Sequence, residues 1–83
     1  MIKTFNTLTV LLGRRQADTG ERWSLRHLAR EADVPKDLVY RLDAGTARYV
    51  DLDALDRLCR ALNCEPADIL IWQNGESEEE SAI

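Results

Sequence analysis

The feature that most constrains the fold of this 83-residue chain is a very short break inside the stretch LAREADVPKDLVYRLDAGT, residues 28–46. Apolar residues recur at helical spacing on both sides of the break, which is centred on Asp33 and Val34. One small polar residue that tolerates a left-handed backbone leaves no room for a loop between helices lying side by side. We therefore expect the two helices to cross steeply.

The starts of four helices are marked by hydrophobic residues spaced five apart around a capping position. Ser24 and Asp51 are favourable caps, Pro35 and Glu65 are weaker ones, and Pro66 falls at the favoured first helical position. The N-terminal segment is less regular, because it is rich in Thr and Val, and it can begin as a strand. The helices are expected at residues 5–18, 25–32, 36–43, 52–62 and 66–71.

Length and composition indicate one small domain. The chain is 45% hydrophobic, which suffices for one compact core and leaves little for a deep catalytic cavity. No Ser/His/Asp set, nucleotide-binding loop or paired-carboxylate pocket occurs, so we expect no enzyme activity and no cofactor. The domain is expected to cover residues 1–72, followed by a disordered acidic tail at residues 73–83.

The charges are distributed unevenly along the chain, although the formal net charge is -4. Residues 1–48 contain nine Lys or Arg and six Asp or Glu, whereas residues 49–72 contain two and five. The tail adds four Glu and no basic residue. The first half is thus the only basic region, and we expect a nucleic-acid partner to bind there.

We expect neither a membrane span nor a metal site. The chain has no apolar run long enough to cross a bilayer, and its N-terminus lacks the features of a secretory signal, which indicates a cytoplasmic protein. Cys59 and Cys64 have no further ligands for a zinc site apart from the distant His27. We therefore expect the cysteines in the core and His27 on the surface of the second helix.

The two helices around Asp33 are expected to share a buried seam. Its predicted members are Leu28, Ala29, Ala32, Val34, Val39 and Leu42. This packing leaves Lys36, Asp37, Tyr40 and Arg41 on the other face of the second helix of the pair. A projecting polar helix on a rigid support suits the major groove of DNA.

Two stretches make the chain resemble the Cro-like, lambda-repressor-like helix-turn-helix proteins, also called the xenobiotic-response-element family. They are LRHLAREADVPKDLVYRLDAG at residues 25–45 and LDALDRLCRALNCEPADIL at residues 52–70. The resemblance covers about residues 7–72 and implies an all-α, compact five-helix bundle that binds DNA. The chain departs from the family's usual residues at Leu25 (Gln), Asp33 (Gly), Pro35 (Ser or Thr) and Tyr40 (Ser). Similar proteins often join the first and third helices by an ion pair, which here implies Arg14 or Arg15 with Asp43.

Nine residues are expected to contact DNA. Lys36 and Arg41 can each reach a phosphate or a guanine edge, and Tyr40 a thymine methyl group or a phosphate. Asp37 can accept from a cytosine amino group or, alternatively, only complement the helix dipole. The resemblance implies that the start of the second helix and the loop after the recognition helix grip the DNA backbone, although each Arg there also fits a solvated face. The full set is Ser24, Arg26, Pro35, Lys36, Asp37, Tyr40, Arg41, Arg48 and Tyr49.

The C-terminal stretch DILIW presents more apolar side chains than a one-sided helix can bury. The surplus indicates a second surface, which we expect to be another copy of the chain. The predicted interface residues are Ile69, Ile71 and Trp72. A homodimer through them would set two recognition helices about 34 Å apart for a palindromic operator. Alternatively, Trp72 folds back on the first helix near Phe5.

Two functions fit these features. The first is a sequence-specific DNA-binding transcriptional regulator, most simply a repressor that occludes a promoter by binding a double-stranded operator. The second is a protein-interaction module on the same scaffold, such as an antitoxin whose acidic tail or apolar end binds a toxin. Binding that weakens at high salt and on Lys36→Ala or Arg41→Ala would favour the first.

Overall fold

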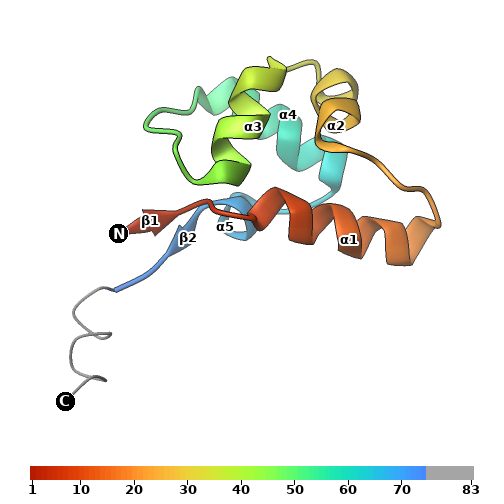
Figure 1. Cartoon of the computed structure of the whole chain (residues 1–83), viewed down its shortest axis with the longest axis horizontal. Coiled ribbons are helices and arrows are strands. Elements are labelled where there is room, and N and C mark those ends of the chain that lie inside the picture. Colours follow the sequence, from red (N-terminus) through yellow and green to blue (C-terminus); the bar gives the residue numbers. More distant parts are fainter. Residues whose placement is uncertain (75–83) are drawn as a thin grey trace.

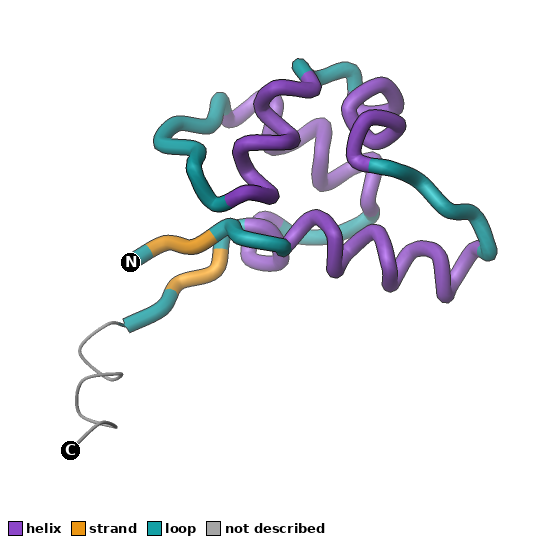
Figure 2. The backbone as a smooth tube through the Cα atoms, viewed as in Figure 1, coloured by secondary structure: helices purple, strands orange, loops and turns teal. Residues whose placement is uncertain are grey.

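The computed structural model describes residues 1–74, which form five helices and one two-stranded ribbon. In chain order the elements are β1 (Ile2–Lys3), α1 (Thr7–Thr19), α2 (Leu25–Ala32), α3 (Lys36–Ala44), α4 (Leu52–Leu62), α5 (Pro66–Ile69) and β2 (Ile71–Trp72). Helix α1 runs along one side of the group formed by α2, α3 and α4, and the ribbon projects beyond the helices (Figure 1). Figure 2 shows how little of the chain between residues 1 and 74 is strand. The predicted all-α class is confirmed.

Each of the four longer helices ends at a residue with a left-handed backbone, which lets the chain turn sharply. These residues are Gly20, Asp33, Gly45 and Asn63, with φ angles between 52° and 78°. Asp33 thus adopts the conformation that its place in the sequence predicted. Gly45 has a second constraint, because a Cβ at this position would lie 3.1 Å from the Cβ of Phe5.

The helix starts agree with the predicted caps in part. The Ser24 hydroxyl oxygen accepts a hydrogen bond from the His27 N–H at 3.0 Å, which confirms this cap. Asp51 occupies the predicted cap position of α4, but its side chain makes no capping bond, so the prediction was wrong in that respect. At α5, the Glu65 N–H donates to Oδ2 of Asp68 at 2.9 Å as part of a capping box.

The core takes at least one fully buried side chain from every helix. The largest are Leu8, Leu28, Leu42, Leu58, Ile69 and Val39. The predicted seam around the turn is confirmed, because Ala29, Ala32 and Val34 are buried as well. Helix α2 packs against both α3 and α4, and small side chains on its buried face allow this close approach.

Helix α1 begins at Thr7 and not at the expected residue 5. Asn6, just before it, has a left-handed backbone (φ 64°), and its N–H donates to the Asp43 carbonyl at 2.8 Å. Thr7 is held by the Thr4 carbonyl, which accepts from its N–H at 3.1 Å and from its hydroxyl at 2.9 Å. The segment does begin as a strand, as its composition allowed, because β1 precedes this turn.

Helix α5 ends at Ile69, and the residues after it form β2 instead of the expected last helical turn. Trp72 lies opposite Ile2 in the ribbon and is 70% exposed, so the alternative in which it folds back on α1 was wrong. The pairing continues to Gln73, which donates to the Met1 carbonyl at 2.7 Å and accepts from the Met1 amine at 2.9 Å. Most of the predicted disordered tail, residues 75–83, lies outside the described residues.

Candidate nucleic-acid interface

The turn between α2 and α3 is tied to α4. Arg57 of α4 donates from Nη1 to the Asp33 carbonyl at 2.9 Å, and the same nitrogen lies 3.4 Å from Oδ2 of Asp33. Its Nε lies 3.2 Å from Oδ2 of Asp53, one turn earlier on α4. The crossing of α2 and α3 is therefore fixed by packing on one side and by this bridge on the other.

Helix α3 has one buried and one exposed face. Leu38, Val39 and Leu42 are buried against the other helices. The side chains at positions 36, 37, 40 and 41 share the opposite face, because residues three and four apart are neighbours on a helix, and all four are exposed. The structure thus brings together the four residues that the sequence placed on a recognition surface.

Within this face, Arg41 is paired with Asp37. Its Nε lies 3.3 Å from Oδ2 of Asp37 and 3.4 Å from the Asp37 carbonyl. An exposed pair four residues apart on a helix contributes only about 0.3–0.5 kcal/mol, so a ligand can displace it. The pair occupies Nε and leaves the outer edge of the guanidinium for a bidentate contact.

Helix α2 supplies cations to one flank of α3. Arg26, Arg30 and Lys36 line a shallow depression of about 370 Å³ between α2 and α3, beside the Asp33 turn. Ser24, at the start of α2, is exposed, and its hydroxyl oxygen is already engaged in the cap. Arg30 was not among the predicted site residues, although its spacing of four from Arg26 on an exposed helix face could have identified it.

The loop between α3 and α4 supplies a second flank. Arg48 and Tyr49 lie in this loop and are exposed, as is Pro35 at the cap of α3. Figure 1 shows α3 between this loop and α2. Among the described residues, no ion pair engages Arg26, Lys36 or Arg48, so these cations are available to phosphate groups.

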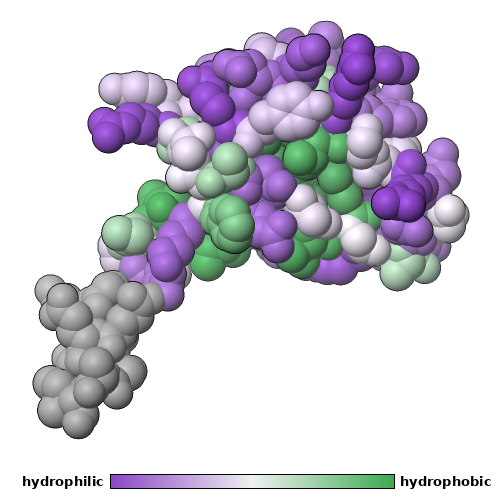
Figure 3. Space-filling view, viewed as in Figure 1, coloured by the Kyte–Doolittle hydropathy of each residue, from purple (hydrophilic) through white to green (hydrophobic). Residues whose placement is uncertain are grey.

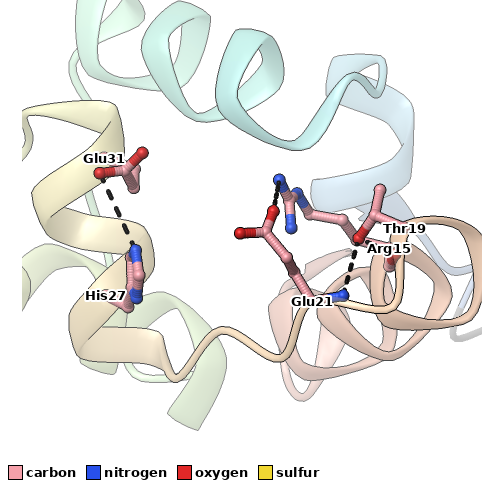
Figure 4. A network of polar contacts seen from close by, with 5 residues as sticks. All are labelled: Arg15, Thr19, Glu21, His27 and Glu31. Atoms are coloured by element: carbon pink, nitrogen blue, oxygen red, sulfur yellow. Dashed lines mark hydrogen bonds and ion pairs between the residues drawn. The ribbon is translucent and has the colours of Figure 1, made fainter.

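The expected ion pair between α1 and α3 was wrong. Asp43 instead accepts from the Thr9 N–H at 3.0 Å and from the Thr9 hydroxyl at 2.6 Å. Arg15 turns toward the loop after α1, where its Nη2 lies 3.3 Å from Oε1 of Glu21 (Figure 4). The reason is geometric, since Asp43 lies near the first turn of α1 and Arg15 is about 9 Å further along the helix axis.

His27 lies in a stack of side chains beside α2. The Arg15 guanidinium lies 3.5 Å from the centroid of the Trp23 ring, and the His27 ring stacks on that of Trp23 at 4.9 Å. Nε2 of His27 lies 3.8 Å from Oε2 of Glu31 (Figure 4). These contacts give His27 a packing role at the start of α2, close to its predicted place on the helix surface.

Cys59 and Cys64 are half-buried and pack against the core, as predicted. Burial raises the pKa of the Cys64 thiol to about 12 and also raises the pKa of Cys59. Burial thus disfavours the thiolate, which is the form of cysteine that binds metals. Within residues 1–74, no three His, Cys, Asp or Glu side chains form a group that could hold a metal ion.

The predicted dimer residues have different environments. Ile69 is fully buried in the core of its own chain, so its assignment to an interface was wrong. The packing of α5 against both α1 and α4 explains the burial. Ile71 and Trp72 lie on the ribbon and are 41% and 70% exposed.

These features define a helix-turn-helix with an exposed, polar second helix. The sequence model of the Cro/C1-type HTH DNA-binding domain matches residues 20–75, about two thirds of the chain, and the protein belongs to this family. The match supports a role as a DNA-binding regulator, and domains of this family are typically not enzymes. Neither the search of curated proteins nor that of solved structures found a match. No helix within the described residues could cross a bilayer.

Proposed function

We propose that the protein is a small dimeric repressor that binds a double-stranded operator with α3 in the major groove. The observation that carries this proposal is the exposed face of α3, with Lys36 and Arg41 on it and unpaired cations on both flanks. A helix that presents an exposed polar face in this way has the width that the major groove of B-DNA admits.

On the recognition face, each side chain has a distinct role in the proposed complex. Lys36 and Arg41 donate to guanine edges or phosphates, and Tyr40 packs on a thymine methyl group. Asp37 orients Arg41 through their ion pair and, when ionised, accepts from a cytosine amino group. Pro35, which precedes the first turn of α3, lies at the edge of the groove.

Two groups hold the DNA backbone on either side of α3 in this proposal. Ser24 and Arg26 contact phosphates from the start of α2, and Arg48 and Tyr49 contact them from the loop after α3. Arg30 joins the first group, because it lines the same depression as Arg26 and Lys36. These contacts would fix the register of α3 without reading the sequence.

The dimer would use the exposed C-terminal ribbon, on which Trp72 lies. Two-fold pairing would place the recognition helices about 34 Å apart, one turn of DNA, on a palindromic site. A protein bound there occludes a promoter that overlaps the site, which is the simplest form of repression.

The experiment is selection of bound fragments from random duplexes, followed by titration of the selected duplex with variants. Lys36→Ala and Arg41→Ala should each weaken binding by about 5–150-fold, the loss expected for one base contact of about 1–3 kcal/mol. The matched control is Arg60→Ala, which removes an exposed cation of α4 that pairs with Asp56 of its own helix. All three variants should keep their helical content by circular dichroism.

Salt dependence separates the contacts to phosphates from those to bases. Removing a phosphate contact such as Arg48 should lower the slope of log affinity against log salt by about one. Equal affinities for Lys36→Ala, Arg41→Ala and Arg60→Ala would contradict the proposal. That result would favour the interaction module, and a neighbouring reading frame for a toxin would then point to an antitoxin.

A further inference from the structure

The ribbon formed by β1 and β2 carries apolar side chains into solvent. Ile2 and Trp72 lie directly opposite each other across the two strands and are 62% and 70% exposed. Because side chains alternate along a strand, Ile2 and Trp72 lie on the same face of the ribbon as Thr4 and Leu70. Thr4 is buried and Leu70 packs against the core, so Ile2 and Trp72 continue the core-facing side of the ribbon beyond the helices. Figure 3 shows hydrophobic surface over the ribbon.

A cleft lies beside these two residues, between the ribbon and the loop after α3. It has a volume of about 250 Å³, and its apolar lining comprises Ile2, Leu42, Ala47, Val50 and Leu70. Arg48 and Tyr49 form the outer part of the same cleft, and Tyr49 is 87% exposed. The volume is below the range of about 300–1,000 Å³ for small-molecule sites, so the cleft suits a single large side chain.

The face therefore contains both a protruding ring, that of Trp72, and a hollow of matching character. A surface with both features is self-complementary, as a two-fold interface between identical chains requires. Ile2, Tyr49 and Trp72 carry no charge, and the one charged residue that lines the cleft, Arg48, lies at its outer part, whereas charged residues are depleted at the centre of interfaces. A second copy fits these features better than an acidic or a basic partner.

The area available fits a weak dimer. With about 200 Å² for a large side chain, the exposed parts of Ile2, Tyr49 and Trp72 amount to about 450 Å² per copy. The partly buried Ala47, Val50 and Leu70 at the cleft raise the total for two copies to about 1,000 Å². This meets the lower bound for a specific interface and falls short of the roughly 1,600 Å² of a standard one.

We propose that two copies of the chain dimerise through the Ile2–Trp72 face of the ribbon, with Trp72 of each copy seated in the cleft beneath the Arg48–Tyr49 loop of the other. This inference rests on the proposed function and assigns the dimer interface to one face of the ribbon. Ile71 lies on the opposite face, with Lys3. The proposed interface also includes Ile2, which is distant in sequence from Tyr49 and Trp72.

The test is sedimentation equilibrium of the full chain without DNA, from about 1 to 200 µM. We expect a monomer–dimer equilibrium with a dissociation constant in the micromolar range. Trp72→Ala should weaken it by about tenfold or more, as is usual for a buried aromatic anchor. Trp72 is mostly exposed in the single chain, so this variant should keep its fold, which a thermal melt checks.

The matched control is Ile71→Ala, which removes an apolar side chain of the same strand on the other face. It should leave the dimer within about twofold of the parent chain. A parent chain that stays monomeric throughout, or a loss for Ile71→Ala as large as for Trp72→Ala, would overturn the proposal.

Binding to half-site duplexes separates this inference from the proposed function. The Trp72→Ala chain should bind a single half-site as tightly as the parent chain and lose only the cooperativity on a full palindrome. A monomeric parent chain that binds half-sites would refute the dimer alone. A dimer that binds no selected duplex would refute the repressor and leave the interface in place.

Discussion

Replacing Arg57 with alanine tests whether α4 holds the turn between α2 and α3. The guanidinium of Arg57 donates to the Asp33 carbonyl at 2.9 Å and also lies 3.4 Å from the Asp33 carboxylate and 3.2 Å from that of Asp53. Asp33 has the left-handed backbone that ends α2. The variant therefore loses a bridge between the support helix and the turn on which the recognition helix depends.

We expect Arg57→Ala to lower the free energy of unfolding by about 1–2 kcal/mol. A hydrogen bond with a charged partner contributes about 1.5–3 kcal/mol, and the lower end or less applies here because the Arg57 side chain is 45% exposed. The two exposed ion pairs add about 0.2–1 kcal/mol. In a domain of this size 1 kcal/mol shifts Tm by about 4–8 °C, so the loss is measurable in a circular-dichroism melt.

Arg60→Ala is the matched control for this measurement. Nε of Arg60 lies 3.0 Å from Oδ2 of Asp56 on the same helix, and the Arg60 side chain is 80% exposed. Its loss should cost about 0.3–0.5 kcal/mol, and most of that should vanish at about 1 M salt. The hydrogen bond from Arg57 to the Asp33 carbonyl is screened less by salt, so the larger loss of stability for Arg57→Ala should persist at about 1 M salt. If the two variants melt at the same temperature, the bridge to Asp33 does not hold the turn.

Three further perturbations follow from other contacts. Ser24→Ala removes the hydrogen bond from the His27 N–H and should lower the free energy of unfolding in urea by about 1 kcal/mol. Asp51→Ala, at a cap position without a side-chain hydrogen bond, should lower it by about half of that or less. Equal losses for the two variants would contradict the capping assignment. Leu58→Ala opens a cavity at a fully buried site and should cost about 2–5 kcal/mol; a loss below about 1 kcal/mol would mean that the core is not close-packed there. Because burial raises the pKa of Cys64 from 9.0 to about 12, folding favours the protonated thiol, and this contribution to stability is present below about pH 9 and is lost as the pH rises toward 12. Cys64→Ser should therefore flatten the decline of Tm above about pH 9, and an unchanged decline would assign it to other groups.

The parts of the fold that local chemistry specifies could be predicted from the sequence. Helices α2 and α4 have the expected bounds, because each lies between a capping position and a residue that accepts a left-handed backbone. The exposed face of α3 follows in the same way, since a helical period assigns Val39 and Leu42 to the core.

The ribbon could not be predicted, because its strands have two residues each and pair the two ends of the described chain. A two-residue strand shows no alternation, and its partner is specified only by the tertiary fold. The hydrogen-bond partner of Asp43 could not be predicted for the same reason, because it too depends on the tertiary fold. The resemblance to helix-turn-helix proteins implied Arg14 or Arg15 as this partner, but the packing of α1 against α3 places Thr9 beside the carboxylate.

The four Glu at residues 75–83 account for the net charge of -4, because residues 1–74 contain eleven basic and eleven acidic side chains. Two of the five acidic residues at 49–72, Asp53 and Asp56, lie on α4, where they are partly neutralised by Arg57 and Arg60. At physiological ionic strength, exposed charges more than about 8 Å apart are largely screened from each other, so the DNA responds to the cations on and beside α3 and not to the net charge of -4. Near 0.01 M salt the screening length grows to about 30 Å, and the acidic residues at positions 49–83 then oppose the approach of DNA. The association rate constant should therefore increase less steeply, as the salt concentration falls, than the number of phosphate contacts alone predicts. An increase as steep as that of a uniformly basic DNA-binding protein would show that the acidic residues do not oppose the approach of DNA.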